Sequence, residues 1–139
     1  MNPSGKTILI IDDDADFAEA LGAALEAAGF RVLRARDGHQ GLKLAKLEAP
    51  DLVLMDIIMS ERTEGFFAIQ EFRRTPSLAS TPIFVLSSLY DAVADFRVAP
   101  EAGWLAHDAF FSKPVDLEEL IRAIRQRLGL NAAVREGTG

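Results

Sequence analysis

The chain has 139 residues, of which 49% are hydrophobic and 26% charged, as expected for one globular domain with one core. A net charge of −6 argues against direct nucleic-acid binding, which depends on Lys and Arg, and against binding to anionic membranes. The absence of cysteine excludes disulfides and thiolate metal sites, and without a long apolar run or a signal-peptide core we expect a cytoplasmic location.

The first strand and helix are predicted between residues 8 and 29. The run at 8–11 is apolar and rich in β-branched residues, a pattern typical of a strand buried on both faces. The segment after it has a helical period, because one face collects Phe17, Leu21, Ala24, Leu25 and Ala28. Asp14 can cap the start of this helix, and Gly29 can end it.

Two further strand–helix pairs are predicted between residues 32 and 73. An apolar run at 32–33 predicts a strand, and the helix after it should begin near Asp37 and end before Pro50. This helix carries the apolar residues Leu42, Ala45 and Leu47. The run at 52–55 predicts the third strand, and residues 64–73 predict the third helix. Its apolar residues, which we expect in the core, are Phe66, Phe67, Ile69 and Phe72.

The runs at 83–86 and 110–111 predict the last two strands. Between them, residues 91–98 can be helical, Pro100 should interrupt the segment, and a turn can resume at 101–106. The final helix is better defined, because Asp116 and Glu119 have capping-box spacing and Gly129 follows as a stop. Its apolar stripe is Leu117, Leu120, Ile121, Ile124 and Leu128. We expect one domain over residues 1–130 and a flexible tail over 131–139.

Strands and helices that alternate five times predict an α/β fold with a doubly wound parallel sheet. Right-handed crossovers place helices on both faces of such a sheet. Ligands bind these folds at the carboxyl ends of the strands, near the point where the strand order reverses. The chemistry of this chain should therefore be sought in the residues that follow each strand.

Polar side chains follow four of the five predicted strands: Asp12, Asp13 and Asp14, then Asp56, then Ser87, then Lys113. Two carboxylates about 4 Å apart repel each other by roughly 4 kcal/mol at an effective dielectric near 20. A hard divalent cation such as Mg²⁺ offsets that repulsion. A carboxylate can also act as a nucleophile and form an acyl phosphate, whose oxygens a metal, an ammonium and a hydroxyl would neutralise.

In this order, and with strands between them, these residues resemble the receiver domain of two-component response regulators. The resemblance covers residues 6–128, and it rests on the acidic pair Asp12 and Asp13, the acceptor Asp56, the hydroxyl of Ser87 and the dipeptide Lys113-Pro114. It implies a five-stranded (βα)5 flavodoxin-like fold with strand order 2-1-3-4-5. The chain departs from the family at 59–60, which reads Met-Ser where Met-Pro is usual, and at 60–64 and 99–107, which are longer.

The resemblance also implies roles for these residues. Asp56 would take a phosphoryl group from a phosphohistidine on a histidine kinase or a histidine phosphotransfer protein. Asp13, Asp56 and the backbone carbonyl of Ile58 would ligate Mg²⁺, and Asp12 would help through water. The protein would be a signalling switch that assists only its own phosphotransfer and dephosphorylation, rather than an enzyme.

Further implied roles concern the response to phosphorylation. Lys113 and Ser87 would contact the phosphoryl oxygens, and a cis bond between Lys113 and Pro114 would aim the lysine at the site. Ser87 and Phe110 would be the switch residues, with the aromatic ring turning as the hydroxyl moves. The changed face would then bind an unknown downstream protein or act on an effector domain absent from this chain.

Three other functions fit parts of the pattern. An aspartyl-phosphate hydrolase would need a second Asp two residues after its nucleophile, where this chain has Ile58. A flavin-binding electron carrier would need a phosphate-binding loop after the first strand, where three aspartates would repel the phosphate. A degenerate receiver would serve as a phosphate-independent binding module. The chain could act alone or be a fragment of a longer regulator.

Overall fold

The computed structural model of the chain describes residues 5–56, 64–87, 109–112 and 114–130. Strands and helices alternate along these segments, as the sequence predicts. The strands are β1 (Thr7–Ile11), β2 (Arg31–Ala35), β3 (Leu52–Asp56), β4 (Ile83–Ser87) and β5 (Ala109–Ser112). The helices are α1 (Ala15–Ala27), α2 (Gly38–Glu48), α3 (Glu64–Arg74), the short 3-10 helix η1 (Pro76–Leu78) and α5 (Leu117–Arg127).

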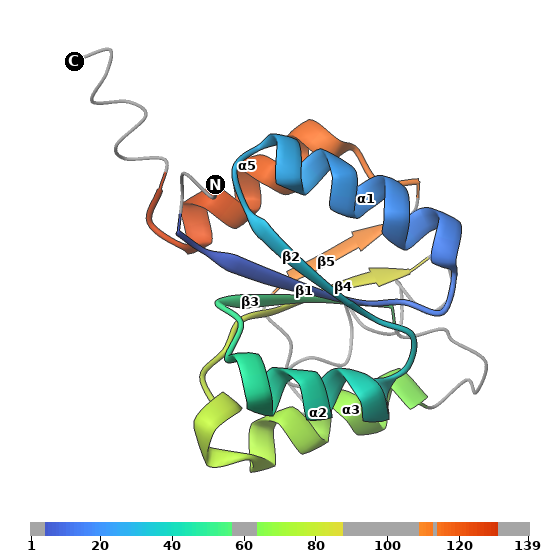
Figure 1. Cartoon of the computed structure of the whole chain (residues 1–139), viewed down its shortest axis with the longest axis vertical. Helices are drawn as coiled ribbons and strands as arrows, with labels where there is room; N and C mark the ends of the chain where they lie inside the picture. The colour runs from blue at the N-terminus through green and yellow to red at the C-terminus, as the bar shows by residue number, and fades with distance from the viewer. Residues whose placement is uncertain (1–4, 57–63, 88–108, 113, 131–139) are drawn as a thin grey trace.

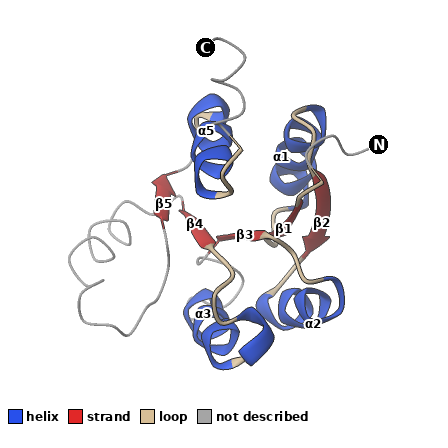
Figure 2. Ribbon diagram, turned by 90° about the vertical axis from the view of Figure 1, so that its left-hand side faces the viewer, coloured by secondary structure: helices blue, strands red, loops and turns tan. Residues whose placement is uncertain are grey.

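The five strands form one parallel sheet in the order β2-β1-β3-β4-β5. Helices α1 and α5 cover one face of this sheet, and α2 and α3 cover the other (Figures 1 and 2). This confirms the predicted fold class and strand order. The order reverses between β1 and β3, so the carboxyl ends of these two strands mark the expected ligand site.

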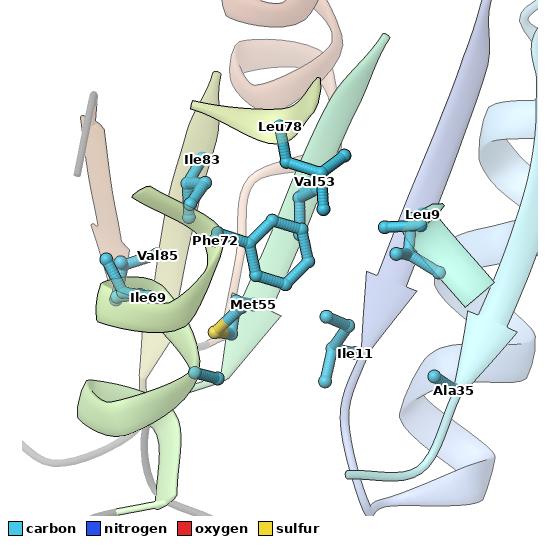
Figure 3. Close-up of a cluster of buried hydrophobic side chains, with 12 residues drawn as sticks. Leu9, Ile11, Ala35, Val53, Met55, Ile69, Phe72, Leu78, Ile83 and Val85 are labelled. Atoms are coloured by element: carbon cyan, nitrogen blue, oxygen red, sulfur yellow. The ribbon is translucent and has the colours of Figure 1, made fainter. Parts of the chain in front are cut away.

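Two apolar layers hold the helices to the sheet. Alternate residues of β1 serve different layers: Ile8 and Ile10 pack toward α1 and α5, whereas Leu9 and Ile11 pack toward α2 and α3. A strand used on both faces needs an unbroken apolar sequence, which explains the run at 8–11. In the layer between the sheet and helices α2 and α3, the ring of Phe72 is fully buried among side chains of β3, β4 and η1 (Figure 3).

The predicted helix starts are confirmed by their caps. The carboxylate of Asp14 accepts a hydrogen bond from the Phe17 amide at 3.1 Å, and that of Asp37 accepts one from the Gln40 amide at 2.7 Å. Asp116 accepts from the amides of the first turn of α5. Each cap satisfies amide groups that have no partner inside the helix.

In three places the structure differs from the simplest interpretation of the apolar pattern. Strand β2 is longer than residues 32–33 and includes Arg31 and Arg34, because an edge strand needs apolar residues only where it meets the helices. On α2, Leu47 is 74% exposed, since the buried face runs through Gly41 and Ala45. Leu117 at the start of α5 is 40% exposed, and Leu120 and Ile124 make the buried part of that stripe.

Among the predicted secondary-structure elements and segments, three lie outside the described residues: the helix at 91–98, the turn at 101–106 and the tail at 131–139. The side chains of Phe66 and Phe67 are also outside the description, whereas Ile69 and Phe72 are buried as expected. Within the described part of the chain, no helix has the length and apolar character needed to cross a membrane.

Candidate functional site

Two buried carboxylates stand out where the sheet order reverses. Asp12 is 2% exposed and Asp56 is 5% exposed, and among the side chains that the structure describes they are the buried polar or charged ones. Burial of a charged group is costly unless an opposite charge or hydrogen bonds compensate it. Two such groups at the predicted ligand edge therefore point to a functional site.

The sheet register brings these carboxylates side by side. Ile11 at the end of β1 is the register partner of Met55 in β3. Asp12 directly follows Ile11 after the end of β1, and Asp56 directly follows Met55 as the last residue of β3. Because the two strands are neighbours and parallel, both aspartates lie at the same edge of the sheet. The amide of Asp12 donates to the carbonyl of Ala35 at 3.0 Å, and its carboxylate accepts from the Asp14 amide at 2.9 Å. These contacts fix the backbone and the side chain of Asp12.

Asp13 adds a third carboxylate from the loop after β1. Its side chain is exposed, and one oxygen each from Asp12, Asp13 and Asp56 lie within 4.8 Å of one another. Three hard oxygen donors at this spacing suit Mg²⁺, which prefers a few carboxylates together with waters and phosphate oxygens. The residues present therefore fit a magnesium ion. Asp14, in contrast, caps α1 as predicted and is separate from this group.

The other predicted site residues are only partly described. The register pairs Asp56 with Leu86, so Ser87, the next and last residue of β4, lies at the same edge of the sheet as the acidic residues. Ser87 also pairs with Ser112, and Phe110 pairs with Val85, which places both predicted switch residues on adjacent strands. The side chains of Ser87 and Phe110, together with Ile58, Lys113 and the predicted cis bond to Pro114, lie outside the described residues.

Sequence reasoning missed the contact of Asp12 with Ala35. The end of β2 holds the acidic loop through this backbone hydrogen bond, and the amide of Arg36, the next residue, donates to the side-chain oxygen of Gln40 at 2.8 Å. Every residue type has a backbone carbonyl, so no pattern of side chains in the sequence could have predicted this hydrogen bond. Only the pairing of β1 with β2 reveals it.

Residues 8–125 match the family model of the response regulator receiver domain. The chain belongs to this receiver family. Members of the family act in general as phosphoryl-accepting switches of two-component systems. The match covers both strands that carry the acidic group and extends into α5.

Curated relatives agree with this assignment. The receiver is 34% identical, over 87% of its length, to the DNA-binding dual master transcriptional regulator RpaA of Synechocystis, and it covers 48% of that protein. It is 36% identical, over 84% of its length, to protein PilH of Pseudomonas aeruginosa, and it covers 93% of that protein. The chain thus spans about half the length of RpaA and nearly all of PilH.

Solved structures with the same fold are also receivers. One is the receiver domain of a sensor histidine kinase from Pseudomonas aeruginosa, determined with a magnesium ion coordinated in its active-site cleft. It has a TM-score of 0.77 and 26% identity, and the match covers 90% of this chain and 98% of that one. A Francisella response regulator receiver domain has a TM-score of 0.73 and 25% identity, with 93% and 99% coverage.

Proposed function

We propose that this receiver accepts a phosphoryl group on Asp56 from the phosphohistidine of a histidine kinase or phosphotransfer protein. Mg²⁺ would be held by Asp13, Asp56 and the backbone carbonyl of Ile58, with Asp12 contributing through water. The observation that carries the proposal is the convergence of Asp12, Asp13 and Asp56 within 4.8 Å, with two of the three buried. Family membership supports the same chemistry.

The transfer would proceed by attack of an Asp56 carboxylate oxygen on phosphorus. The phosphorus–nitrogen bond breaks, its electron pair leaves with the imidazole nitrogen, and an acyl phosphate forms on Asp56. Mg²⁺ held by these residues would supply positive charge that offsets the negative charge of the phosphoryl oxygens and of the surrounding carboxylates. The buried position of Asp56, at 5% exposure, would limit the access of water to the acyl linkage.

The remaining parts of the proposal come from the residues that match the family motif. Lys113 and Ser87 would contact the phosphoryl oxygens. Ser87 and Phe110 would carry the change toward α5 and so alter the face that a downstream protein or an effector domain binds. The chain would not be an enzyme, because Ile58 occupies the position where an aspartyl-phosphate hydrolase needs an acid–base group.

The test is incubation with Mg²⁺ and acetyl phosphate, followed by intact-mass measurement. We expect one added phosphoryl group in the wild type, none in Asp56→Asn, and an unchanged result in Asp16→Asn. Asp16 is a matched control because it is an exposed carboxylate in the first turn of α1. Undiminished modification of Asp56→Asn would contradict the assignment of the acceptor.

Two other outcomes would favour the rival functions. A wild-type protein that binds Mg²⁺ but takes no phosphate, from acetyl phosphate or from a phosphorylated phosphotransfer protein, would favour a phosphate-independent binding module. Continuous release of phosphate from small organic phosphates, at many turnovers per protein, would favour a hydrolase. Slow release limited to the single group on Asp56 would support the switch.

A further inference from the structure

Helix α2 approaches strand β1 unusually closely at Gly41. A Cβ atom built on Gly41 would lie 2.3 Å from Cδ1 and 2.6 Å from Cγ1 of Ile11. Side-chain carbon atoms do not approach this closely, so any residue larger than glycine would have to displace Ile11 or the helix. The space that a side chain at position 41 would fill is already filled by Ile11.

Ile11 has little freedom to move away. It is fully buried, and it belongs to the apolar cluster that includes Met55 and Ala35 (Figure 3). Its side chain is branched at Cβ, which restricts rotation about the first side-chain bond. The close atoms include Cγ1, which rotation of the side-chain tip alone cannot remove.

Ile11 immediately precedes Asp12 and Asp13 in the chain. Its backbone is the last of β1 and pairs with Ala35 of β2 and Met55 of β3. The amide of Asp12 then donates to the Ala35 carbonyl at 3.0 Å. A displacement of the Ile11 side chain would therefore act one peptide bond away from Asp12, the first of the three clustered carboxylates.

We propose that Gly41 is a positioning residue for the metal site, because its missing side chain lets Ile11 set the positions of Asp12 and Asp13. This inference rests on the proposed binding of Mg²⁺ by the acidic group. Gly41 touches neither the carboxylates nor the phosphate and acts through Ile11. Groups that hydrogen-bond directly to metal ligands typically change metal affinity by about 10- to 100-fold when they are altered. A residue that acts through packing, as Gly41 does, should have an effect no larger than the lower end of this range.

Gly22 on α1 provides a matched comparison. A Cβ built there would lie 2.0 Å from the terminal nitrogen of Arg34, but this close neighbour is the far end of a flexible, partly exposed side chain. The Arg34 guanidinium can move aside toward solvent. Gly22→Ala therefore adds the same methyl group to a helix glycine, and the three atoms nearest to that methyl group belong to Arg34 rather than to β1 or the acidic residues.

The experiment is a cycle of four proteins, in which Mg²⁺ affinity is measured by calorimetric titration and folding by urea denaturation. The variants are Gly41→Ala, Ile11→Ala and the double variant, because alanine at position 11 removes Cγ1 as well as Cδ1, the two atoms that crowd position 41. We expect Gly41→Ala to weaken Mg²⁺ binding by up to about tenfold in the wild-type background. In the Ile11→Ala background the same substitution should cost little further affinity, and Gly22→Ala should match the wild type.

The outcomes separate the two proposals. A wild type that binds no Mg²⁺ would contradict the proposed function itself. Wild-type affinity in a folded Gly41→Ala protein, or an equal loss of affinity when Gly41→Ala is made in the Ile11→Ala background, would overturn the positioning role alone. If Gly41→Ala does not fold, Ile11→Leu disturbs the same contact from the strand side. In that case unchanged Mg²⁺ affinity in a folded Ile11→Leu protein would overturn the role.

Discussion

Asp12 and Asp56 lie next to each other at the ends of neighbouring parallel strands, and both carboxylates are buried, at 2% and 5% exposure. Like charges held together in a partly dry environment repel each other more strongly than they would in water. The fold keeps them together because the register of β1 and β3 is fixed by the apolar residues that precede them. A bound divalent cation would relieve this repulsion, so metal binding and stability should be linked.

We predict that Mg²⁺ raises the free energy of unfolding of the wild type. Binding to the folded state alone adds about 2.7 kcal/mol at a free concentration 100 times the dissociation constant. Asp13→Asn should lose most of this gain, because one of the three ligands becomes neutral, while the stability without metal changes little at this exposed position. Urea denaturation with Mg²⁺ and with a chelator measures the difference, and Asp16→Asn is the control.

An equal gain in stability for Asp13→Asn and the wild type would show that Mg²⁺ acts elsewhere or without specificity. The result would then count against the metal site, since Asp13 is one of only three described side chains in the acidic group. A reduced gain in Asp16→Asn as well would point to a general effect of the acidic face of α1.

The next prediction concerns the core beneath the sheet. Phe72 is fully buried between α3, η1 and the sheet, so Phe72→Ala should lower the free energy of unfolding by about 3–5 kcal/mol. Leu47→Ala is the matched control, because Leu47 is 74% exposed and should change stability by no more than about 0.5 kcal/mol. Urea denaturation of both variants tests this, and similar losses for the two would contradict the described packing.

The response to phosphorylation should appear on β5 and α5. We predict that the backbone amide signals of Ala109–Ser112 and of α5 shift when Asp56 is phosphorylated, while those at the end of α2 change little. Small movements at the site would bias a two-state element that a partner then selects. Nuclear magnetic resonance spectra of the wild type and of Ser87→Ala, each before and after phosphorylation, test the idea.

Ser87→Ala is informative because the proposed coupling begins at that hydroxyl. It should still take up phosphate on Asp56, since the acceptor and the metal ligands are unchanged, but the shifts on α5 should shrink. Unchanged spectra of the wild type after stoichiometric phosphorylation would contradict the switch. Equal shifts in both proteins would show that the change reaches α5 without the hydroxyl of Ser87.

The carboxyl-edge residues could be predicted from sequence because their positions follow from general rules. In a doubly wound sheet, whatever follows β1 and β3 must meet at one edge, so Asp12, Asp13 and Asp56 needed no knowledge of side-chain packing. The helix caps Asp14, Asp37 and Asp116 could also be predicted from the local sequence, because each side chain accepts hydrogen bonds from amides two or three residues away.

Features that depend on register or on packing across layers were not predictable. The extent of β2 follows from its pairing with β1. Its two arginines interrupt the apolar run, so the sequence pattern shows only part of the strand. The exposure of Leu47 depends on how α2 is rotated against the sheet. The contact of Gly41 with Ile11 depends on how closely α2 packs against β1, and the two residues are 30 positions apart in the sequence. No local sequence pattern gives that spacing.

The last prediction concerns the lifetime of the phosphorylated state. Hydrolysis of the acyl phosphate needs a water molecule aligned opposite the Asp56 oxygen. The family resemblance places the residues that orient or exclude this water two positions after the acceptor and two after the hydroxyl residue, which are Ile58 and Leu89 here. Both lie outside the described residues, so the prediction rests on their chemistry: neither side chain can form a hydrogen bond to water.

We therefore expect slow self-dephosphorylation, suited to a signal that persists. An Ile58→Asn, Leu89→Glu double variant introduces two groups that can hold a water molecule and should lose its phosphate several-fold faster. The rate is measured as the decay of the phosphorylated mass after removal of the phosphodonor, with Mg²⁺ present throughout. Leu47→Gln, a polar substitution at an exposed residue of α2, controls for general effects of added polarity. If the double variant loses phosphate no faster than the wild type and this control, positions 58 and 89 do not set the lifetime, and other features of the site must exclude water from Asp56.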